Sequence, residues 1–155
     1  MQPHPPAPGS VLVVGGGYLG GRAADAWLAA GRTVFVLTRG RAAELSARGF
    51  IPIIGDVLDS ATLAKLPAVE TVLYAVGLDR SAGRSMRDVY VGGVGNVAAN
   101  VPTPAKFIYI SSTSVYAQAG GEWVDEDSET APREESGRVV LDAERELRRH
   151  VAGAG

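Results

Sequence analysis

The chain has 155 residues, and its 15 Lys and Arg against 17 Asp and Glu give a formal net charge of −2. This near-zero charge argues against a protein that grips nucleic acid or an anionic membrane through bulk positive charge. The absence of cysteine excludes a disulfide framework, a thiolate zinc site and a cysteine nucleophile. The two histidines, His4 and His150, lie near opposite ends of the chain, which disfavours a histidine metal cluster. Glycine is in clear excess, with 20 residues of 155, because average usage is about 7%.

The N-terminal ten residues carry four prolines and no apolar run. This composition predicts a flexible lead-in over residues 1–10, followed by one domain over residues 11–155, and not a signal peptide. No stretch approaches the roughly 20 apolar residues of a membrane helix. We therefore expect a cytoplasmic protein with neither a nucleic-acid nor a membrane partner.

Apolar runs of strand length alternate with helix-like segments, a rhythm typical of a parallel sheet with helices on both faces. The predicted strands are Val11–Val14, Thr33–Leu37, Phe50–Ile54, Thr71–Ala75 and Lys106–Ile110. Pro52 cannot donate a ladder hydrogen bond, so the third strand is predicted at a sheet edge. The predicted fold class is α/β, a doubly wound parallel sheet of about five strands in three α/β/α layers.

The segment after the first strand predicts an amphipathic helix. Leu19, Ala23, Ala26, Trp27 and Ala30 recur at a helical period, which predicts that Trp27 packs against the sheet. The glycine at position 31 is predicted to end this helix as a left-handed cap. Further helices are predicted over Arg41–Arg48, Ser60–Leu66, Met86–Asn100 and Arg138–Val151.

The segment Gly120–Gly137 is polar, acidic and too long for a simple connection, which indicates a functional or mobile loop. Its acidic side chains favour a solvated loop on the substrate side. Binding of a cation or of a basic partner is the alternative.

A glycine-rich turn, GGGYLG, follows the first predicted strand directly and opens the first predicted helix. In this G-x-G-x-x-G pattern Gly15 serves a tight turn, Gly17 lets backbone approach a pyrophosphate, and Gly20 allows close helix packing. The helix N-terminus adds free N–H groups and partial positive charge. We predict a dinucleotide site that includes Tyr18 and Leu19 of the same turn; the alternative is a tight turn without a ligand.

The end of the second predicted strand distinguishes NAD from NADP. An NAD site usually presents an acid there, about 20 residues past the glycines. Between Asp25 and Glu44 the chain has no acid, and Thr38 and Arg39 occupy the place. A guanidinium pairs with a 2′-phosphate through charge-assisted hydrogen bonds. We therefore predict NADP as cofactor, with NAD as the alternative; in the other interpretation Arg39 and Arg41 are solvated loop charges.

Further motifs follow the third, fourth and fifth predicted strands. They are Gly55, Asp56 and Val57, then Ala75, Val76 and Gly77, then ISSTSVYA from residue 110. From about residue 11 to its end the chain resembles the extended and atypical short-chain dehydrogenases/reductases, the NAD-dependent epimerases/dehydratases, in which a strand ends in S-S-x-x-V-Y. The resemblance is to the N-terminal, NAD(P)-binding Rossmann half of these proteins.

The resemblance implies roles for several of these residues. Asp56 would contact the adenine edge, with Val57 in the same site, and Ala75, Val76 and Gly77 would line the cofactor. The family's catalytic Ser or Thr is the second position of S-S-x-x-V-Y, which here is Ser112. Its hydroxyl, at the carboxyl end of a parallel strand, could hydrogen-bond a substrate oxygen. The alternative is that this Ser/Thr run satisfies backbone groups in a turn.

The chain departs from the family pattern in the next helix. Family enzymes carry Y-x-x-x-K there, whereas alignment through the helix glutamate places Ser136 at the tyrosine and Val140 at the lysine. Serine has no accessible pKa near neutrality and valine has no charge, so the usual proton-transfer device is absent. In the preceding helix Gly93 and Asn96 match the family's G-T-x-N, while Tyr90 stands where an asparagine is usual.

The resemblance also implies the function. Extended family members are about twice this long, so we expect the cofactor-binding half without a C-terminal substrate domain. The leading hypothesis is NADP-dependent hydride transfer on a small carbonyl, alcohol or sugar-nucleotide-like substrate, with Ser112 orienting the substrate oxygen. The rivals are a non-catalytic dinucleotide-binding sensor or scaffold, and a flavin- or quinone-reductase-like member. Expected partners are the small-molecule substrate and a second copy, a homodimer through the helices at about residues 86–100 and 138–151.

Overall fold

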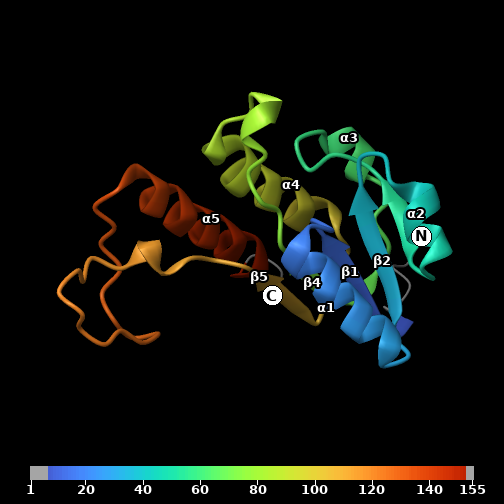
Figure 1. Ribbon diagram of the computed structural model, residues 1–155, viewed down its shortest axis with the longest axis horizontal. Helices are drawn as coiled ribbons and strands as arrows, with labels where there is room; N and C mark the ends of the chain where they lie inside the picture. Colours follow the sequence, from blue (N-terminus) through green and yellow to red (C-terminus); the bar gives the residue numbers. More distant parts are fainter. Residues whose placement is uncertain (1–6, 153–155) are drawn as a thin grey trace.

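The computed structural model describes residues 7–152, which form a single five-stranded parallel sheet flanked by helices (Figure 1). Its strands are β1 (Ala7–Val14), β2 (Thr33–Thr38), β3 (Ile51–Ile54), β4 (Val69–Tyr74) and β5 (Lys106–Tyr109). The strand order is β3-β2-β1-β4-β5, which confirms the predicted edge position of the strand that holds Pro52. From β1 the chain adds β2 and β3 on one side and β4 and β5 on the other. The position between β1 and β4 is therefore the topological switch point, where open α/β sheets bind ligands.

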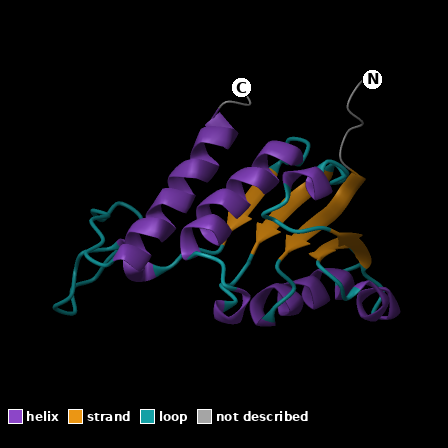
Figure 2. Cartoon of the chain, turned by 90° about the horizontal axis from the view of Figure 1, so that it is seen from above, coloured by secondary structure: helices purple, strands orange, loops and turns teal. Residues whose placement is uncertain are grey.

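Helices cover both faces of this sheet, as predicted for a doubly wound Rossmann-like fold (Figure 2). One face carries α1 (Tyr18–Ala29) and α2 (Ala42–Ala47), and the other carries α3 (Ser60–Leu63), α4 (Gly93–Asn100) and α5 (Glu135–Ala152). Short helical turns are η1 (Arg80–Ala82), η2 (Asp88–Gly92) and η3 (Thr113–Val115). The helix predicted over 86–100 is confirmed: residues 86–87 are α-helical, and a wide π-helical turn, η2, follows them before α4.

The central strand β1 is buried on both of its sides. Val11, Leu12, Val13 and Val14 are all 0% exposed. Leu12 and Val14 belong to the core under α3, α4 and α5, whereas Val11 and Val13 belong to the core under α1 and α2. Side chains alternate between the faces of a strand, so a continuous apolar run serves two cores at once.

The strand β1 begins earlier than the sequence predicted. Ala7 to Ser10, which we expected in a flexible lead-in, are part of β1. The amide of Gly9 donates to Glu70 Oε2 (2.6 Å) and its carbonyl accepts from Arg32 Nε (2.7 Å). Arg32 and Glu70 also pair with each other (3.2 Å). Side chains distant in sequence therefore fix this segment despite Pro8; residues 1–6, including His4, lie outside the described residues.

The apolar stripe predicted on α1 is partly wrong. Leu19, Ala26 and Ala30 are exposed, whereas Gly20 and Ala24 are buried. The side of α1 that approaches the sheet is the side of Gly20, because the missing Cβ lets the helix come closest there. The packing of Trp27 against the sheet is confirmed, and Gly31 has the left-handed φ of +76° expected of the cap.

Tyr74, the last residue of β4, joins the sheet to η2. Its side chain is 1% exposed, and its hydroxyl donates to the carbonyl of Val89 at 2.7 Å. Burial raises the pKa of Tyr74 above its ordinary value, so the hydroxyl keeps its proton. A Cβ at Gly93 would overlap this hydroxyl, which explains why glycine stands there.

We expect Tyr74→Phe to destabilise the protein by about 1–3 kcal/mol, because the Val89 carbonyl would be left buried without its donor. Urea unfolding followed by circular dichroism measures this difference. Tyr18→Phe is the matched control, since the Tyr18 side chain is 84% exposed. Equal unfolding midpoints for Tyr74→Phe and the unmodified chain would contradict the assigned role of the hydroxyl.

Candidate functional site

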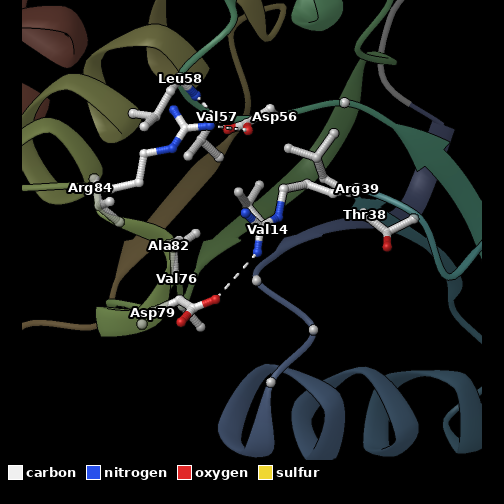
Figure 3. Close-up of a pocket in the computed structure, with 18 of the residues that line it drawn as sticks. Val14, Thr38, Arg39, Asp56, Val57, Leu58, Val76, Asp79, Ala82 and Arg84 are labelled. Carbon is white, nitrogen blue, oxygen red and sulfur yellow. Dashed lines mark hydrogen bonds and ion pairs between the residues drawn. The ribbon is translucent and has the colours of Figure 1, made fainter.

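A cavity of about 590 Å³ opens at the carboxyl ends of β1, β2, β3 and β4 (Figure 3). It lies at the topological switch point, and its walls come from the loops that follow these four strands. The predicted cofactor residues that line it are Gly15, Gly17, Thr38, Arg39, Asp56, Val57, Ala75, Val76 and Gly77. Residues distant in sequence are thus brought together at one edge of the sheet.

The glycine-rich turn forms the wall that follows β1. Gly15 has a φ of +97°, and a Cβ there would lie 2.6 Å from the carbonyl oxygen of Ala75. A Cβ at Gly20 would overlap the carbonyl oxygen of Gly15. In contrast, a Cβ at Gly17 would meet no atom within 4 Å in the described structure. Gly15 and Gly20 are therefore required by packing, whereas Gly17 leaves open space beside the cavity.

The N-terminus of α1 faces the same turn. Gly17 is its N-cap residue, and among the described residues no side chain caps it and no acid stands in its first turn. The first amides of a helix have no intrahelical partner and carry partial positive charge. Free amides beside an open glycine are an arrangement that fits a pyrophosphate.

Three predicted cofactor residues lie outside the cavity lining. Tyr18 is 84% exposed and Leu19 is 49% exposed. The Tyr18 ring lies under the guanidinium of Arg22, 5.5 Å from its centroid. Gly20 is buried and acts through packing on the turn. A cofactor contact by Tyr18 or Leu19 stays a prediction.

The loop after β2 forms the basic rim of the cavity. Thr38 is 9% exposed, and its Oγ1 accepts from the amides of Gly40 (3.4 Å) and Arg41 (3.1 Å). Thr38 therefore shapes the loop through its hydroxyl. Arg41 Nη2 donates to the carbonyl of Gly16 at 2.8 Å and joins this loop to the glycine-rich turn. The side chain of Arg39 extends toward Asp79, with 3.9 Å between Nη2 and Oδ2 (Figure 3).

Asp56 lies on the opposite rim, after β3. Its Oδ1 accepts from the amide of Leu58 (2.9 Å), and its Oδ2 lies 3.3 Å from Arg84 Nη2 (Figure 3). Its own amide donates to Thr62 Oγ1 (3.0 Å). The next residue, Val57, is held through its carbonyl by Asn96 Nδ2 of α4 (2.9 Å). These bonds fix the backbone that carries the predicted adenine contact.

The segment after β4 contributes lining residues that the sequence did not reveal. Leu78, Asp79, Ala82 and Arg84 all face the cavity. This segment shows neither a strand pattern nor a helix pattern nor a known motif, so no sequence signal distinguished it. The carboxylate of Asp79 caps η1 by accepting from the amide (3.0 Å) and the hydroxyl (2.6 Å) of Ser81. These hydrogen bonds lower the pKa of Asp79 below its ordinary value.

Ser112 does not line the cavity. It is exposed after β5, and its Oγ accepts from the amide of Ser114 at 3.2 Å as the cap of η3. This is the geometry expected if the Ser/Thr run satisfies backbone groups in a turn. Ser111 Oγ donates to Glu144 and so joins the loop after β5 to α5. A substrate-facing role for Ser112 stays a prediction.

The positions of the family's tyrosine and lysine differ in their surroundings. Ser136 is exposed, whereas Val140 is 4% exposed in an apolar cluster with Val115 and Leu141. The ring of Tyr90 packs against this cluster, and its hydroxyl accepts from the amide of Leu78 at 3.3 Å. An aromatic ring and a valine therefore fill the place where the family has asparagine and lysine.

Tyr74 and Tyr109 do not replace the missing acid/base pair. Burial raises the pKa of Tyr109 to about 12, and that of Tyr74 is raised for the same reason. Both hydroxyls keep their protons at neutral pH, and neither residue is in the cavity lining. Neither tyrosine therefore supplies a proton-transfer group with a pKa near neutrality.

Residues 7–152 offer neither a cluster of metal ligands nor a membrane-spanning helix. Within this range no group of three or more His, Cys, Asp or Glu side chains is placed to hold a metal ion. No helix in the same range is both long and apolar enough to cross a membrane.

The model of the NAD dependent epimerase/dehydratase family matches residues 11–152. The chain belongs to this family. A search of curated proteins found no match. Among solved structures, one described as an NAD-dependent epimerase/dehydratase from Methylobacillus flagellatus is 30% identical, with a TM-score of 0.71 over 91% of this chain and 50% of that chain.

Two other solved structures show the same likeness. A short-chain dehydrogenase/reductase superfamily protein from Agrobacterium tumefaciens, with bound NAD, is 25% identical with a TM-score of 0.70, over 91% of this chain and 44% of its own. The UDP-Glc/GlcNAc 4-epimerase of Campylobacter jejuni shares the fold at 20% identity and a TM-score of 0.76. The match covers 93% of this chain and 49% of the epimerase chain. The chain thus spans about half the length of the family structures it matches.

Proposed function

We propose that the chain is the NAD(P)-binding domain of an epimerase-like or oxidoreductase protein. The observation that carries the proposal is the cavity at the topological switch point. There Gly17, the N-cap residue of α1, borders open space, and no side chain of the described residues caps the helix. These groups fit the pyrophosphate, and the rims at Arg39 and Asp56 fit the adenosine end. When bound, the cofactor would supply or accept a hydride. The family relatives support the same assignment, since one of them holds NAD.

We further propose that NADP(H) is the preferred cofactor. The end of β2 presents Thr38 and Arg39 where an NAD site has an acid, and both side chains lie at the cavity. A guanidinium is suited to an anionic 2′-phosphate, because it offers several donors in one plane. The second arginine of the loop, Arg41, adds positive charge to the same rim.

The proposed chemistry is hydride transfer on a small carbonyl, alcohol or sugar-nucleotide-like substrate. Ser112 would orient the substrate oxygen: its Oγ accepts a bond from Ser114, so its own hydrogen remains available for donation. The proposal includes a homodimer through α4 and α5, for which the support is that the two helices lie side by side on one face of the sheet (Figure 2).

A non-catalytic dinucleotide-binding module is the second candidate. The burial of Val140 in an apolar cluster favours it, because no charge can stand there to hold a ribose or to lower a hydroxyl pKa. Turnover of NADPH with a panel of carbonyl substrates, by a protein extended to the length of its relatives, distinguishes the two. Cofactor binding without turnover across the panel would favour the binding module.

Fluorescence titration with NADPH and NADH tests the cofactor proposal. We expect NADPH to bind about 10- to 100-fold more tightly, since a hydrogen bond to a charged group contributes about 1.5–3 kcal/mol. Arg39→Ala should remove this preference, because it should weaken NADPH binding far more than NADH binding, since NADH has no 2′-phosphate. Arg149→Ala is the control, because that side chain is 74% exposed on α5. Equal affinities of the unmodified chain for both cofactors would overturn the NADP assignment.

A further inference from the structure

The two rims of the cavity are joined by the segment that follows β4. Residues 78–84 are called here the strap; four of them, Leu78, Asp79, Ala82 and Arg84, line the cavity, and the side chains of Asp79 and Arg84 reach the rims (Figure 3). Asp79 pairs with Arg39 (3.9 Å), and Arg84 pairs with Asp56 (3.3 Å). Arg39 and Asp56 are the residues proposed to hold the adenosine end of the cofactor. The strap therefore supplies counter-charges to both of them.

The carboxylate of Asp79 is held in a defined position. It accepts from the amide (3.0 Å) and the hydroxyl (2.6 Å) of Ser81, so it caps η1 while it faces Arg39. The pair between Arg84 and Asp56 fixes the other end of the strap to the loop after β3. Hydrogen bonds from Ser81 lower the pKa of Asp79, so it carries its charge at neutral pH.

A carboxylate and a phosphate are the same kind of partner for a guanidinium. Both offer oxygens that accept paired N–H bonds, and both are anions. The side chains of Arg39 and Asp79 are 62% and 51% exposed, and an exposed ion pair contributes little stability. The pair can therefore be exchanged for another anion at small cost.

We propose that Asp79 is a specificity-determining residue of this site, which competes with the 2′-phosphate of NADP(H) for the guanidinium of Arg39. The inference rests on the proposed cofactor function. NADPH binding would exchange the partner of Arg39, whereas NADH binding would leave the pair with Asp79 in place. An acid on the strap thus moderates a preference for NADP(H) that the end of β2 alone would make stronger.

Asp79→Asn tests the proposal, because asparagine keeps an oxygen that can cap η1 but removes the charge. We expect NADPH to bind about fivefold more tightly in fluorescence titration, the upper range of an exposed ion pair, while NADH affinity changes by less than about twofold. In the Arg39→Ala background the same substitution should change NADPH affinity by less than about twofold, since there is no guanidinium to release. Circular dichroism verifies that each variant is folded.

Asp125→Asn is the matched control. The carboxylate of Asp125 accepts from Ser128 Oγ (2.7 Å) and from the amide of Asp127 (3.2 Å), as Asp79 accepts from Ser81. It lies in the long loop drawn in orange in Figure 1, which extends away from the sheet and does not line the cavity. Neither cofactor's affinity should change.

The results distinguish a failure of the Asp79 inference from a failure of the proposed NADP(H) preference. If Arg39→Ala weakens NADPH binding but Asp79→Asn does not strengthen it, the role of Asp79 is wrong and the cofactor proposal stands. Equal strengthening of NADPH and NADH by Asp79→Asn also overturns the inference, because the effect would not depend on the 2′-phosphate. If Arg39→Ala changes neither affinity, both are overturned.

Discussion

Gly20→Ala is expected to destabilise the protein by about 3 kcal/mol, the upper part of the range for overpacking a close contact. The new Cβ would overlap the carbonyl oxygen of Gly15, which is backbone in the turn after β1 and cannot move aside as a flexible side chain would. Either α1 must lift from the sheet or the turn must distort. Alanine's better helix propensity offsets only about 1 kcal/mol of this cost.

Gly21→Ala is the matched control for this prediction. Gly21 is the next residue of α1, and a Cβ there would lie 3.7 Å from the nearest backbone oxygen, an ordinary contact. Chemical unfolding of both variants measures the difference. A Gly20→Ala protein as stable as Gly21→Ala would show that the close approach of α1 to the turn is not required.

Gly17→Val is expected to leave the fold intact and to lower the affinity for NADPH and NADH alike by about 100-fold. No described atom lies within 4 Å of a Cβ at this position, and its φ of −73° and ψ of −157° suit any residue. The valine side chain would instead occupy the space beside the uncapped start of α1, where the pyrophosphate is proposed to bind. Overpacking such a contact costs about 1–3 kcal/mol, and each 1.4 kcal/mol is tenfold in affinity.

Unfolding and titration are both needed to interpret this variant. An unchanged denaturation midpoint with lost binding supports the assignment of Gly17 to the phosphates. Unchanged binding of both cofactors would place the pyrophosphate elsewhere. The contrast with Gly20, where the same kind of change affects stability first, distinguishes the two glycines of one motif.

The sequence predicted what depends on local pattern. The apolar run of β1 and the order of glycines after it are read within about ten residues, and the structure has both as expected. The edge position of Pro52 follows from one missing amide, which is also a local property. The loops at the ends of β1, β2, β3 and β4 then meet at one cavity because parallel strands present their carboxyl ends together.

What the sequence missed depends on pairs of residues distant along the chain. The early start of β1 rests on Glu70 and Arg32, which reach Gly9 across 61 and 23 positions. Which side of α1 is buried depends on the close approach of Gly20 to the turn after β1. The spacing of apolar residues along the helix does not predict this contact. Nothing in the sequence around Asp79 indicates a role in the site, because its partner Arg39 lies in the loop after a different strand, β2.

The two walls of the cavity differ in how firmly they are prepared for a ligand. The glycine-rich turn follows β1, whose side chains are anchored in both cores, so its backbone is set before any ligand arrives. The strap is joined to the rims by exposed ion pairs, which screening by salt weakens. A binding group that is already in place adds no ordering cost to the affinity. The phosphate end of the ligand would thus meet a preorganised backbone, whereas the ion pairs at the adenosine end would weaken as salt is added.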